Sequence, residues 1–397
     1  MTTQTQTAPV AKTPDAEGEF QTGQVLTIVS GHFMHDTFSA FVAPLLPLII
    51  EKLSLSLTLA GSLWGFTQLP ALLNPFIGYL ADKFSLRYFV ILAPAVTATL
   101  MSLLGLAPNY LTLAIILLAA GVSIAAFHAP APPMIARISG NRLGKGMSLF
   151  MAGGELGRTV GPLLIVWAVS IWTLDGYFRI MVLGWATSLL LFWRLREIPA
   201  RPDRRQSLRV MLPVARRLFV PLLGIVAPQA FMLTALAVYL PTFMSRQGAS
   251  LWVAGASLSI WELAGIGGAL AGGTLSDRVG RKTVLVVGMA TSSVLMFIFL
   301  SIKGWLLVPV LLALGFTALS TTPVMLAMVQ ESMSHNRAVA NGLYLSMTFL
   351  ARPLAAFIIG LLGDSLGLHS AFYISTVIAL LAIPVVFFLP ERDEQER

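Results

Sequence analysis

Long runs of apolar residues recur along the whole chain, and short polar stretches separate them. Each run holds about 20 residues, which is enough to cross a hydrocarbon core of roughly 30 Å as an α-helix. The pattern predicts an all-α polytopic membrane protein with twelve transmembrane helices, at 25 to 50, 57 to 80, 88 to 107, 110 to 138, 144 to 172, 176 to 194, 218 to 244, 251 to 274, 283 to 302, 305 to 332, 339 to 363 and 368 to 389.

The longest polar interruption lies between the sixth and seventh spans, and arginine dominates it. It divides the chain into two six-helix bundles, at 25–194 and 218–390, joined by a basic cytoplasmic linker at 195–217. The first residues are rich in Thr, Gln, Pro and Ala and lack the basic start and short apolar core of a signal peptide. We therefore expect a disordered cytoplasmic tail at 1–24 and a second cytoplasmic tail at 391–397.

Composition and charge agree with a membrane protein. Of the 397 residues, 56% are hydrophobic and 11% are charged, whereas a soluble chain carries about 25% charged residues. If both termini are cytoplasmic, 20 of the 26 Lys and Arg residues lie on the cytoplasmic side, 4 lie outside, and Arg158 and Arg352 lie within spans. This asymmetry follows the positive-inside rule. It accounts for the net charge of +8 without a nucleic-acid partner, and the basic linker also suits contact with anionic membrane lipid.

Several classes of chemistry find no support in the sequence. The chain has no cysteine, so disulfides, thiolate metal sites and cysteine nucleophiles are excluded. It has no Gly-x-x-x-x-Gly-Lys-Ser/Thr loop for a nucleotide phosphate and no His-x-x-Glu-His or similar metal cluster. We expect no enzyme activity, no cofactor and no metal site.

One short motif occurs twice, at the ends of the second and eighth spans, 195 residues apart. The copies are Gly78-Tyr-Leu-Ala-Asp82-Lys83-Phe-Ser-Leu-Arg87 and Gly273-Thr-Leu-Ser-Asp277-Arg278-Val-Gly280-Arg281-Lys282. Glycine permits close helix contact, and an Asp near a helix end can form a charge-assisted clamp with the basic residues that follow. Such a clamp opens and closes in a transporter whose two halves rock against each other.

The repeated motif resembles the loop signature of the major facilitator superfamily, Gly-x-Leu-Ala-Asp-Arg-x-Gly-Arg-Lys. The later copy matches it closely, whereas the earlier copy has Lys83 in place of Arg and lacks the inner glycine. The resemblance implies two pseudo-symmetric bundles around a central site, with alternating access by rocking. It assigns a gating role to Gly78, Asp82, Lys83, Arg87, Gly273, Asp277, Arg278, Gly280 and Arg281.

A narrower resemblance covers residues 31 to 163. Its motifs are Gly31-His32-Phe-Met-His35-Asp36, Ala43-Pro44-Leu-Leu-Pro47, Asn74-Pro75-Phe-Ile-Gly78-Tyr79, Ala126-Phe127-His128 and Gly153-Gly154-x-x-Gly157-x-x-x-Gly161-Pro162. They look like the fosmidomycin-resistance branch of the same superfamily. The chain departs from that branch at His35, where an amide is usual, and at Glu155 and Arg158. The resemblance implies a proton-coupled exporter of small organic molecules in a bacterial inner membrane.

Ionisable groups within the spans indicate where function lies, because a charge at bilayer depth costs at least about 2.5–3.5 kcal/mol unless it faces a partner or a water-filled cavity. His32 and Asp36 stand four residues apart on one helical face, where they can share a proton. We predict Asp36 as the leading proton carrier; the alternative is a static His–Asp hydrogen bond. His35 points about 100° away from Asp36, which favours packing or lining.

The fifth span carries Glu155 and Arg158 three residues apart, so the two can pair on one face. The pair either stabilises the helix bundle or takes part in substrate binding and proton coupling. The repeat shift places Arg352 within one residue of Arg158, so two arginines approach the centre from symmetry-related helices. Arginine offers a planar fork of donors suited to carboxylate, phosphate or phosphonate. Glu262, in the eighth span, is expected to pair with Arg158 or to carry a second proton.

The prolines that follow His128 predict a bent or broken helix there, which leaves carbonyl groups free to line a cavity. His128 then either lines the substrate site or is a satisfied structural histidine. Our hypothesis is a monomeric secondary transporter that exports a small organic compound in exchange for protons, and the two arginines favour an anionic compound. Proton coupling falls to Asp36, His32, Glu155 and Glu262, and substrate binding to Arg158, Arg352, His128 and His35. The alternatives are proton-coupled uptake of an organic anion and a sensor that keeps a transporter fold.

Overall fold

The computed structural model describes residues 19–73, 77, 87–196, 212–332 and 337–390, and within these ranges the chain forms helices and turns with no strand. The helices of the first half are α1 (Thr22–Ser39), α2 (Val42–Leu53), α3 (Leu57–Gln68), α5 (Arg87–Ser102), α6 (Tyr110–His128), α7 (Ala131–Ile138), α8 (Leu143–Gly176) and α9 (Met181–Leu195). Short 3-10 turns extend several of them, at Leu69–Leu73, Leu104–Leu106, Gly140–Arg142 and Tyr177–Ile180.

The second half begins with α10 (Leu212–Thr234), which continues through a π-helical turn at Ala235–Tyr239 into α11 (Leu240–Arg246). The helices that follow are α12 (Leu251–Val279), α13 (Arg281–Ser301), α14 (Leu307–Leu319), α15 (Thr321–Ser332), α16 (Arg337–Leu366), α17 (Leu368–Leu380) and α18 (Ala382–Val386), with a 3-10 turn at Gly304–Leu306.

The predicted all-α fold is confirmed, and each of the twelve predicted spans coincides with helix in the described residues. Some spans are broken within the membrane segment. The predicted break after His128 is present, since α6 ends there and α7 begins at Ala131 with prolines in its first turn. The first span also divides, into α1 and α2. Pro44 has no N–H to give to the carbonyl of Ala40, at the point where α1 ends.

Ten helical segments among the described residues are long and apolar enough to cross a membrane. One of these, Leu143–Leu195, contains both the fifth and the sixth predicted spans, which meet near a non-helical residue at Thr173. The second predicted span lies partly outside the described residues. The boundaries predicted for the two tails and the linker also fall mainly on residues outside these ranges and stay predictions.

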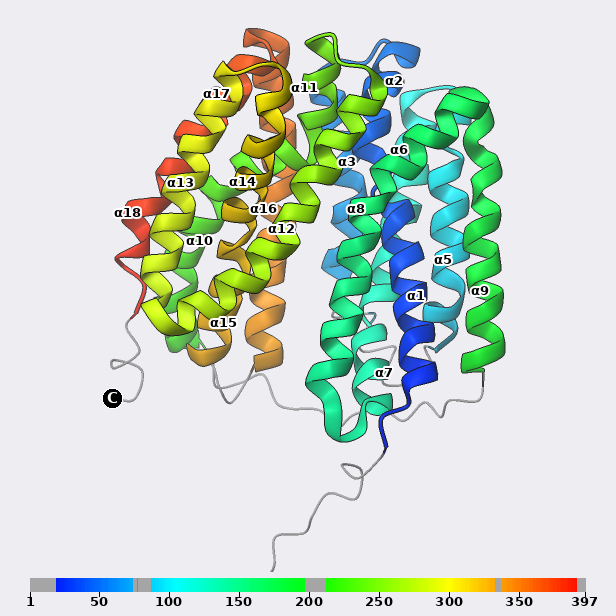
Figure 1. Cartoon of the computed structure of the whole chain (residues 1–397), viewed down its shortest axis with the longest axis horizontal. Coiled ribbons are helices and arrows are strands. Elements are labelled where there is room, and N and C mark those ends of the chain that lie inside the picture. The colour runs from blue at the N-terminus through cyan, green and yellow to red at the C-terminus, as the bar shows by residue number, and fades with distance from the viewer. Residues whose placement is uncertain (1–18, 74–76, 78–86, 197–211, 333–336, 391–397) are drawn as a thin grey trace, which may run out of the picture.

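The two halves lie side by side (Figure 1), with α1 to α9 in one group and α10 to α18 in the other. The main contacts between them are those of α3 with α16, α8 with α12 and α2 with α11. In Figure 1 the start of α1, the end of α9 and the start of α10 lie at the lower end of the molecule, which we call the termini end.

The hydrophobic core shows where the halves are joined. One large cluster of buried side chains runs through both halves and includes Phe41, Leu45, Leu236, Tyr239 and Ile359. Two further clusters stay within single halves, one around Leu222 and Val329 and the other around Ile28 and Phe127. The halves therefore share a core at the end away from the termini, which we call the closed end, and keep separate cores at the termini end.

Hydrogen bonds reinforce the closed end. The carboxylate of Asp364, at the end of α16, accepts hydrogen bonds from the backbone N–H groups of Leu57 (2.7 Å) and Thr58 (2.9 Å) and from the Thr58 hydroxyl (2.6 Å). The Tyr239 hydroxyl lies 2.7 Å from the carbonyl oxygen of Ala356 and 3.1 Å from that of Leu57. The first turn of α3 is thus held by two residues of the other half.

Candidate functional site

The buried face of α1 carries the first part of the site. His32 and Asp36 lie one helical turn apart, and the Nε2 atom of His32 is 3.4 Å from Oδ2 of Asp36. Both side chains are almost fully buried, with 5% and 4% of their surface exposed. The predicted contact between the imidazole and the carboxylate is present. The proton-coupling role of the pair stays a prediction.

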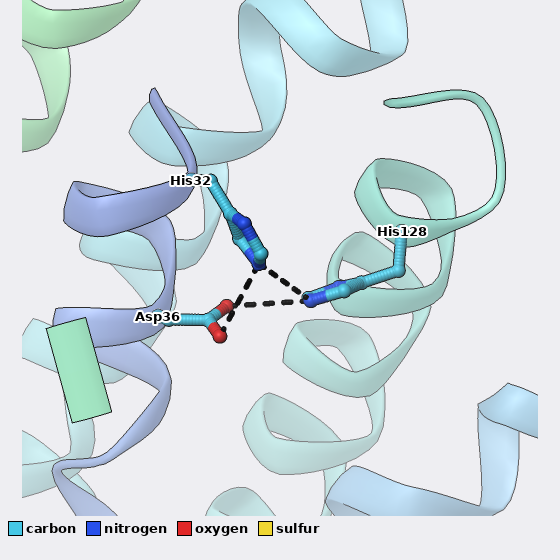
Figure 2. Close-up of side chains that lie close together, drawn as sticks. All are labelled: His32, Asp36 and His128. Atoms are coloured by element: carbon cyan, nitrogen blue, oxygen red, sulfur yellow. Dashed lines mark hydrogen bonds and ion pairs between the residues drawn. The ribbon is translucent and has the colours of Figure 1, made fainter. Parts of the chain in front are cut away.

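His128 joins this pair from the end of α6, as Figure 2 shows. Its Nε2 atom lies 3.4 Å from Oδ1 of Asp36 and 3.3 Å from Nε2 of His32. The other nitrogen of each ring meets a backbone carbonyl: Nδ1 of His32 lies 2.8 Å from the oxygen of Phe150, and Nδ1 of His128 lies 2.9 Å from that of Ile124. A carbonyl can only accept, so both Nδ1 atoms carry hydrogen and donate.

Glycines of α8 allow this close packing. A Cβ atom on Gly154 would lie 2.5 Å from Nε2 of His32 and 3.0 Å from Oδ2 of Asp36. A Cβ on Gly157 would lie 2.4 Å from the carbonyl oxygen of Phe33, and one on Gly161 would lie 2.4 Å from that of Thr37. The spaced glycines of the fifth span therefore serve tight contact between α8 and α1, as expected of small residues at helix interfaces in membranes.

Arg158 connects α8 to the centre of this cluster. One of its guanidinium nitrogens lies 3.3 Å from Oδ2 of Asp36, and another forms an ion pair with Glu155 one turn earlier. The predicted pairing of Glu155 with Arg158 is therefore present. Unlike Asp36, these two side chains are partly open, with 27% of Glu155 and 40% of Arg158 exposed. One guanidinium is shared between a buried carboxylate and an accessible one.

Glu262 of α12 and Arg352 of α16 extend the charged group into the second half. Arg158 and Glu155 interact electrostatically with both residues, and Glu262 and Arg352 interact with each other. Within the described residues no ion pair of 4.0 Å or less joins Glu262 to Arg158, so the expected direct pair is replaced by interaction at longer range. The in-span charges singled out in the sequence thus gather between the two halves.

His35 packs beside the cluster, with its ring 5.5 Å from that of His128, but it forms no hydrogen bond with the cluster. Its ring is fully buried and stacks on Phe127, with 4.5 Å between centroids and 18° between planes. Neither ring nitrogen has a hydrogen-bond partner within the described residues. This position agrees with the packing role that its direction on α1 indicates, and its predicted place in substrate binding stays a prediction.

The later copy of the repeated motif forms a compact charge cluster at the termini end. Arg281 pairs with Asp277 at 2.6 Å and with Glu331 of α15 at 2.7 Å, and it donates to the Ser276 hydroxyl. Gly280 has a φ of 95°, which a residue with a side chain rarely adopts. Arg278 is exposed, and Gly273 has open space around it. Of the earlier copy, Gly78, Asp82 and Lys83 lie outside the described residues, and Arg87 begins α5.

Sequence reasoning missed the long-range contacts of three residues. Glu331, Tyr239 and Asp364 contact partners 50, 182 and 307 residues away. No short-range pattern marks such pairs. An acidic residue at the end of a membrane span was the one available signal for Asp364.

Comparison with known proteins gives consistent results. A family model described as "Major Facilitator Superfamily" matches residues 28–282 and 267–397. Among curated proteins, the fosmidomycin resistance protein of Escherichia coli (strain K12) is 24% identical over 97% of both chains. The class B tetracycline resistance protein of Escherichia coli is 23% identical over 77% of this chain and 80% of its own.

Solved structures show the same fold. A bacterial homologue of the human lysosomal transporter Spinster, in an inward-facing and unoccupied conformation, has a TM-score of 0.80 and 15% identity, covering 93% of this chain and 96% of its own. A D-xylose–proton symporter has a TM-score of 0.74 and 18% identity, covering 94% and 99%.

Proposed function

Since this chain belongs to the Major Facilitator Superfamily and is a multi-pass membrane transporter of a small molecule rather than an enzyme, we propose that it exports a small organic anion in exchange for protons. The names of its relatives, which include resistance to fosmidomycin and to tetracycline, favour export. We place the protein in a bacterial inner membrane with both termini in the cytoplasm, because that orientation satisfies the positive-inside rule.

One observation carries the proposal for an anion: two arginines and two glutamates from both halves form one electrostatic group. Arg158 and Arg352 come from α8 and α16, so an anion between them would touch both halves at once. Two guanidinium forks suit a carboxylate, phosphate or phosphonate. A ligand that bridges the halves also has different contacts in each state of a rocking transporter, which is what drives alternating access.

The closed end supports an inward-facing state of the cycle. The halves share a core there and keep separate cores at the termini end. With the proposed orientation, the end with separate cores faces the cytoplasm, and the partly exposed side chains of Arg158 and Glu155 would be reached from that side. This is the state in which an exporter takes up its substrate.

Protons enter the exchange proposal through Glu262. Exchange requires that the proton-bound chain and the anion-bound chain change state separately. Glu262 lies in the second half opposite Arg158, so its charge affects the same space that the anion occupies. For exchange, the chain with a neutral Glu262 must change state without the anion, so that protonation and anion binding occupy separate steps.

A second candidate, proton-coupled uptake of an organic anion, is favoured by the ion pair between Arg158 and Glu155. A proton on Glu155 would release Arg158 for an anion, so that proton and anion bind together. Co-binding is the requirement for transport in the same direction.

The direction of a pH gradient separates the two candidates. A thermal-shift screen of the purified protein against organic anions, phosphonates and cationic drugs first finds a ligand, because a ligand of the native state raises its stability. Flux of that ligand is then measured in proteoliposomes of known orientation. Exchange predicts that the anion moves against the proton gradient, and co-transport predicts that it moves with it. Stabilisation by cations alone, or no gradient-dependent flux of any confirmed ligand, contradicts the proposal.

Arg352→Gln tests the anion site itself. We expect it to abolish anion transport while the protein stays folded and inserted. Arg246→Gln is the matched control, because Arg246 is an arginine at the end of α11 and outside the charged group. Unaltered anion transport by Arg352→Gln contradicts a substrate role for this residue.

A further inference from the structure

Three acceptor atoms face one another between α1 and α6 (Figure 2). Because both Nδ1 atoms donate to backbone carbonyls, the Nε2 atoms of neutral His32 and His128 each present a lone pair. These lone pairs lie 3.3 Å apart, and each is 3.4 Å from an oxygen of the Asp36 carboxylate. None of the three groups then has a hydrogen to give to another.

A cation at the centre would give these acceptor groups a partner. The cation can be a proton or a metal ion. A proton on the Nε2 atom of one histidine makes that atom a hydrogen-bond donor. It can then donate well to only one of the other two groups, so the remaining acceptor has no hydrogen-bond partner in the cluster. A metal ion binds all three acceptors at once. The charges around the cluster also favour a cation. Arg158 lies 3.3 Å from Asp36 but also pairs with Glu155, so its single positive charge balances only part of the negative charge of the two carboxylates.

The distances fit a metal ion of a particular class. Zinc lies about 2.0–2.2 Å from His nitrogen and carboxylate oxygen, in tetrahedral geometry. Two ligand atoms of a tetrahedron with such bonds are about 3.3–3.6 Å apart. The two Nε2 atoms lie 3.3 Å apart, Nε2 of His32 lies 3.4 Å from Oδ2 of Asp36, and Nε2 of His128 lies 3.4 Å from Oδ1 of Asp36. Each of these pairs has the spacing of a tetrahedral edge, and one ligand atom from each of the three residues lies within 4.8 Å of the others.

The second layer of contacts is also that of a metal site. Histidines that bind metals nearly always donate their other N–H group to a carbonyl or carboxylate, and ligating carboxylates are themselves hydrogen-bonded. Phe150 and Ile124 supply the two carbonyls, and Arg158 contacts the carboxylate.

We propose that His32, Asp36 and His128 bind one divalent transition-metal ion of the zinc class. Two imidazoles and one carboxylate suit Zn²⁺, Co²⁺ or Ni²⁺. They do not suit Mg²⁺ or Ca²⁺, which require mainly oxygen ligands. The fourth position of the tetrahedron is left to water or to a small ligand. The geometry that supports this site does not rely on the proposed transport of an anion, and the site departs from the absence of a metal site expected from the sequence.

Metal binding by the purified full-length protein, with any affinity tag removed, tests the site. Isothermal titration with Zn²⁺ should show one ion per chain, and Co²⁺ should give the intense visible absorption of a tetrahedral complex. Mg²⁺ should give no signal. His128→Gln and Asp36→Asn should each weaken Zn²⁺ binding at least tenfold. His369→Gln is the matched control, since this histidine contacts the Leu300 carbonyl elsewhere in the protein, and it should leave affinity unchanged.

Gly154→Ala provides a variant that keeps all three ligands. Its Cβ would lie 2.5 Å from Nε2 of His32, so it should distort the Co²⁺ spectrum or remove it. Wild-type protein that gives no tetrahedral Co²⁺ spectrum overturns the proposal, and the centre then holds a proton. Zinc binding that is equal in wild type, His128→Gln and Asp36→Asn, each monodisperse on gel filtration, also overturns it. Flux assays in the presence of a chelator test the transport proposal separately.

Discussion

The carboxylate of Asp364 holds the closed end, and its removal should shift the balance between the two states of the transporter. In the described structure it caps the first turn of α3 across the boundary between the halves, with three hydrogen bonds of 2.6–2.9 Å. If the halves separate at this end, all three bonds break together. Asp364→Ala therefore removes an interaction that exists in one state of the cycle and is absent in the other.

The size of the effect follows from the kind of contact. A helix N-cap contributes about 0.5–2 kcal/mol, and a negative charge near a helix N-terminus adds about 0.3–1 kcal/mol. Asp364 is exposed, so water replaces part of what is lost. A net change of about 1–2 kcal/mol corresponds to a factor of about 5–30 in the equilibrium. A state open at this end in about 1% of molecules would then rise to about 5–25%.

Distance measurements between spin labels can detect such a change. The chain contains no cysteine, so Pro108→Cys and Gln247→Cys place one label in each half at the closed end without further substitutions. We expect Asp364→Ala to add a population at longer distance. Asp175→Ala is the control, because Asp175 also lies at this end but pairs with Lys52 of the same half. An unchanged distance distribution in folded Asp364→Ala refutes a stabilising role for the Asp364 hydrogen bonds at the closed end. An equal change in Asp175→Ala shows that loss of any carboxylate at this end has the same effect.

The remaining predictions concern packing, the charge cluster at the termini end and orientation. Gly157→Leu should prevent α8 from packing on α1, because even a Cβ atom would lie 2.4 Å from the Phe33 carbonyl oxygen. Gel filtration should show loss of the monodisperse protein, whereas Gly144→Leu should behave as wild type because Gly144 has open space around it. Glu331→Ala should lower the melting temperature, since Arg281 loses its partner on α15; an unchanged temperature contradicts a stabilising pair. In intact cells, an impermeant thiol reagent should label Gln247→Cys and spare Gly144→Cys; the reverse pattern contradicts the proposed orientation.

Patterns of short range carried most of the correct predictions. Hydropathy predicted spans that all coincide with helix in the described residues, because every backbone group in a bilayer must be satisfied within a helix and the apolar length is fixed by the membrane. Spacing of four residues brought His32 to Asp36, and spacing of three brought Glu155 to Arg158. The break after His128 followed from its prolines.

Contacts between distant segments were beyond reach of these patterns. His128 meets His32 across 96 residues, and the carbonyl that orients the His32 ring belongs to α8, whose packing on α1 depends on its glycines. The sequence shows two histidines and an aspartate but not that three acceptor atoms converge. In the same way, the internal repeat brought Arg352 and Arg158 to the same region without giving the distance between them.

Arg158 is the residue through which these separate features act on one another. Its single positive charge is divided between Asp36, which is buried, and Glu155, which is partly open, and it also interacts with Glu262 of the other half. A cation that neutralises Asp36 weakens the attraction between Asp36 and the Arg158 guanidinium. A proton on Glu155 likewise weakens the attraction between Glu155 and this guanidinium. Either event leaves more of the charge of Arg158 for an anion between the halves. The occupancy of the α1 centre and the affinity of the anion site are therefore expected to depend on each other, with equal effect in both directions.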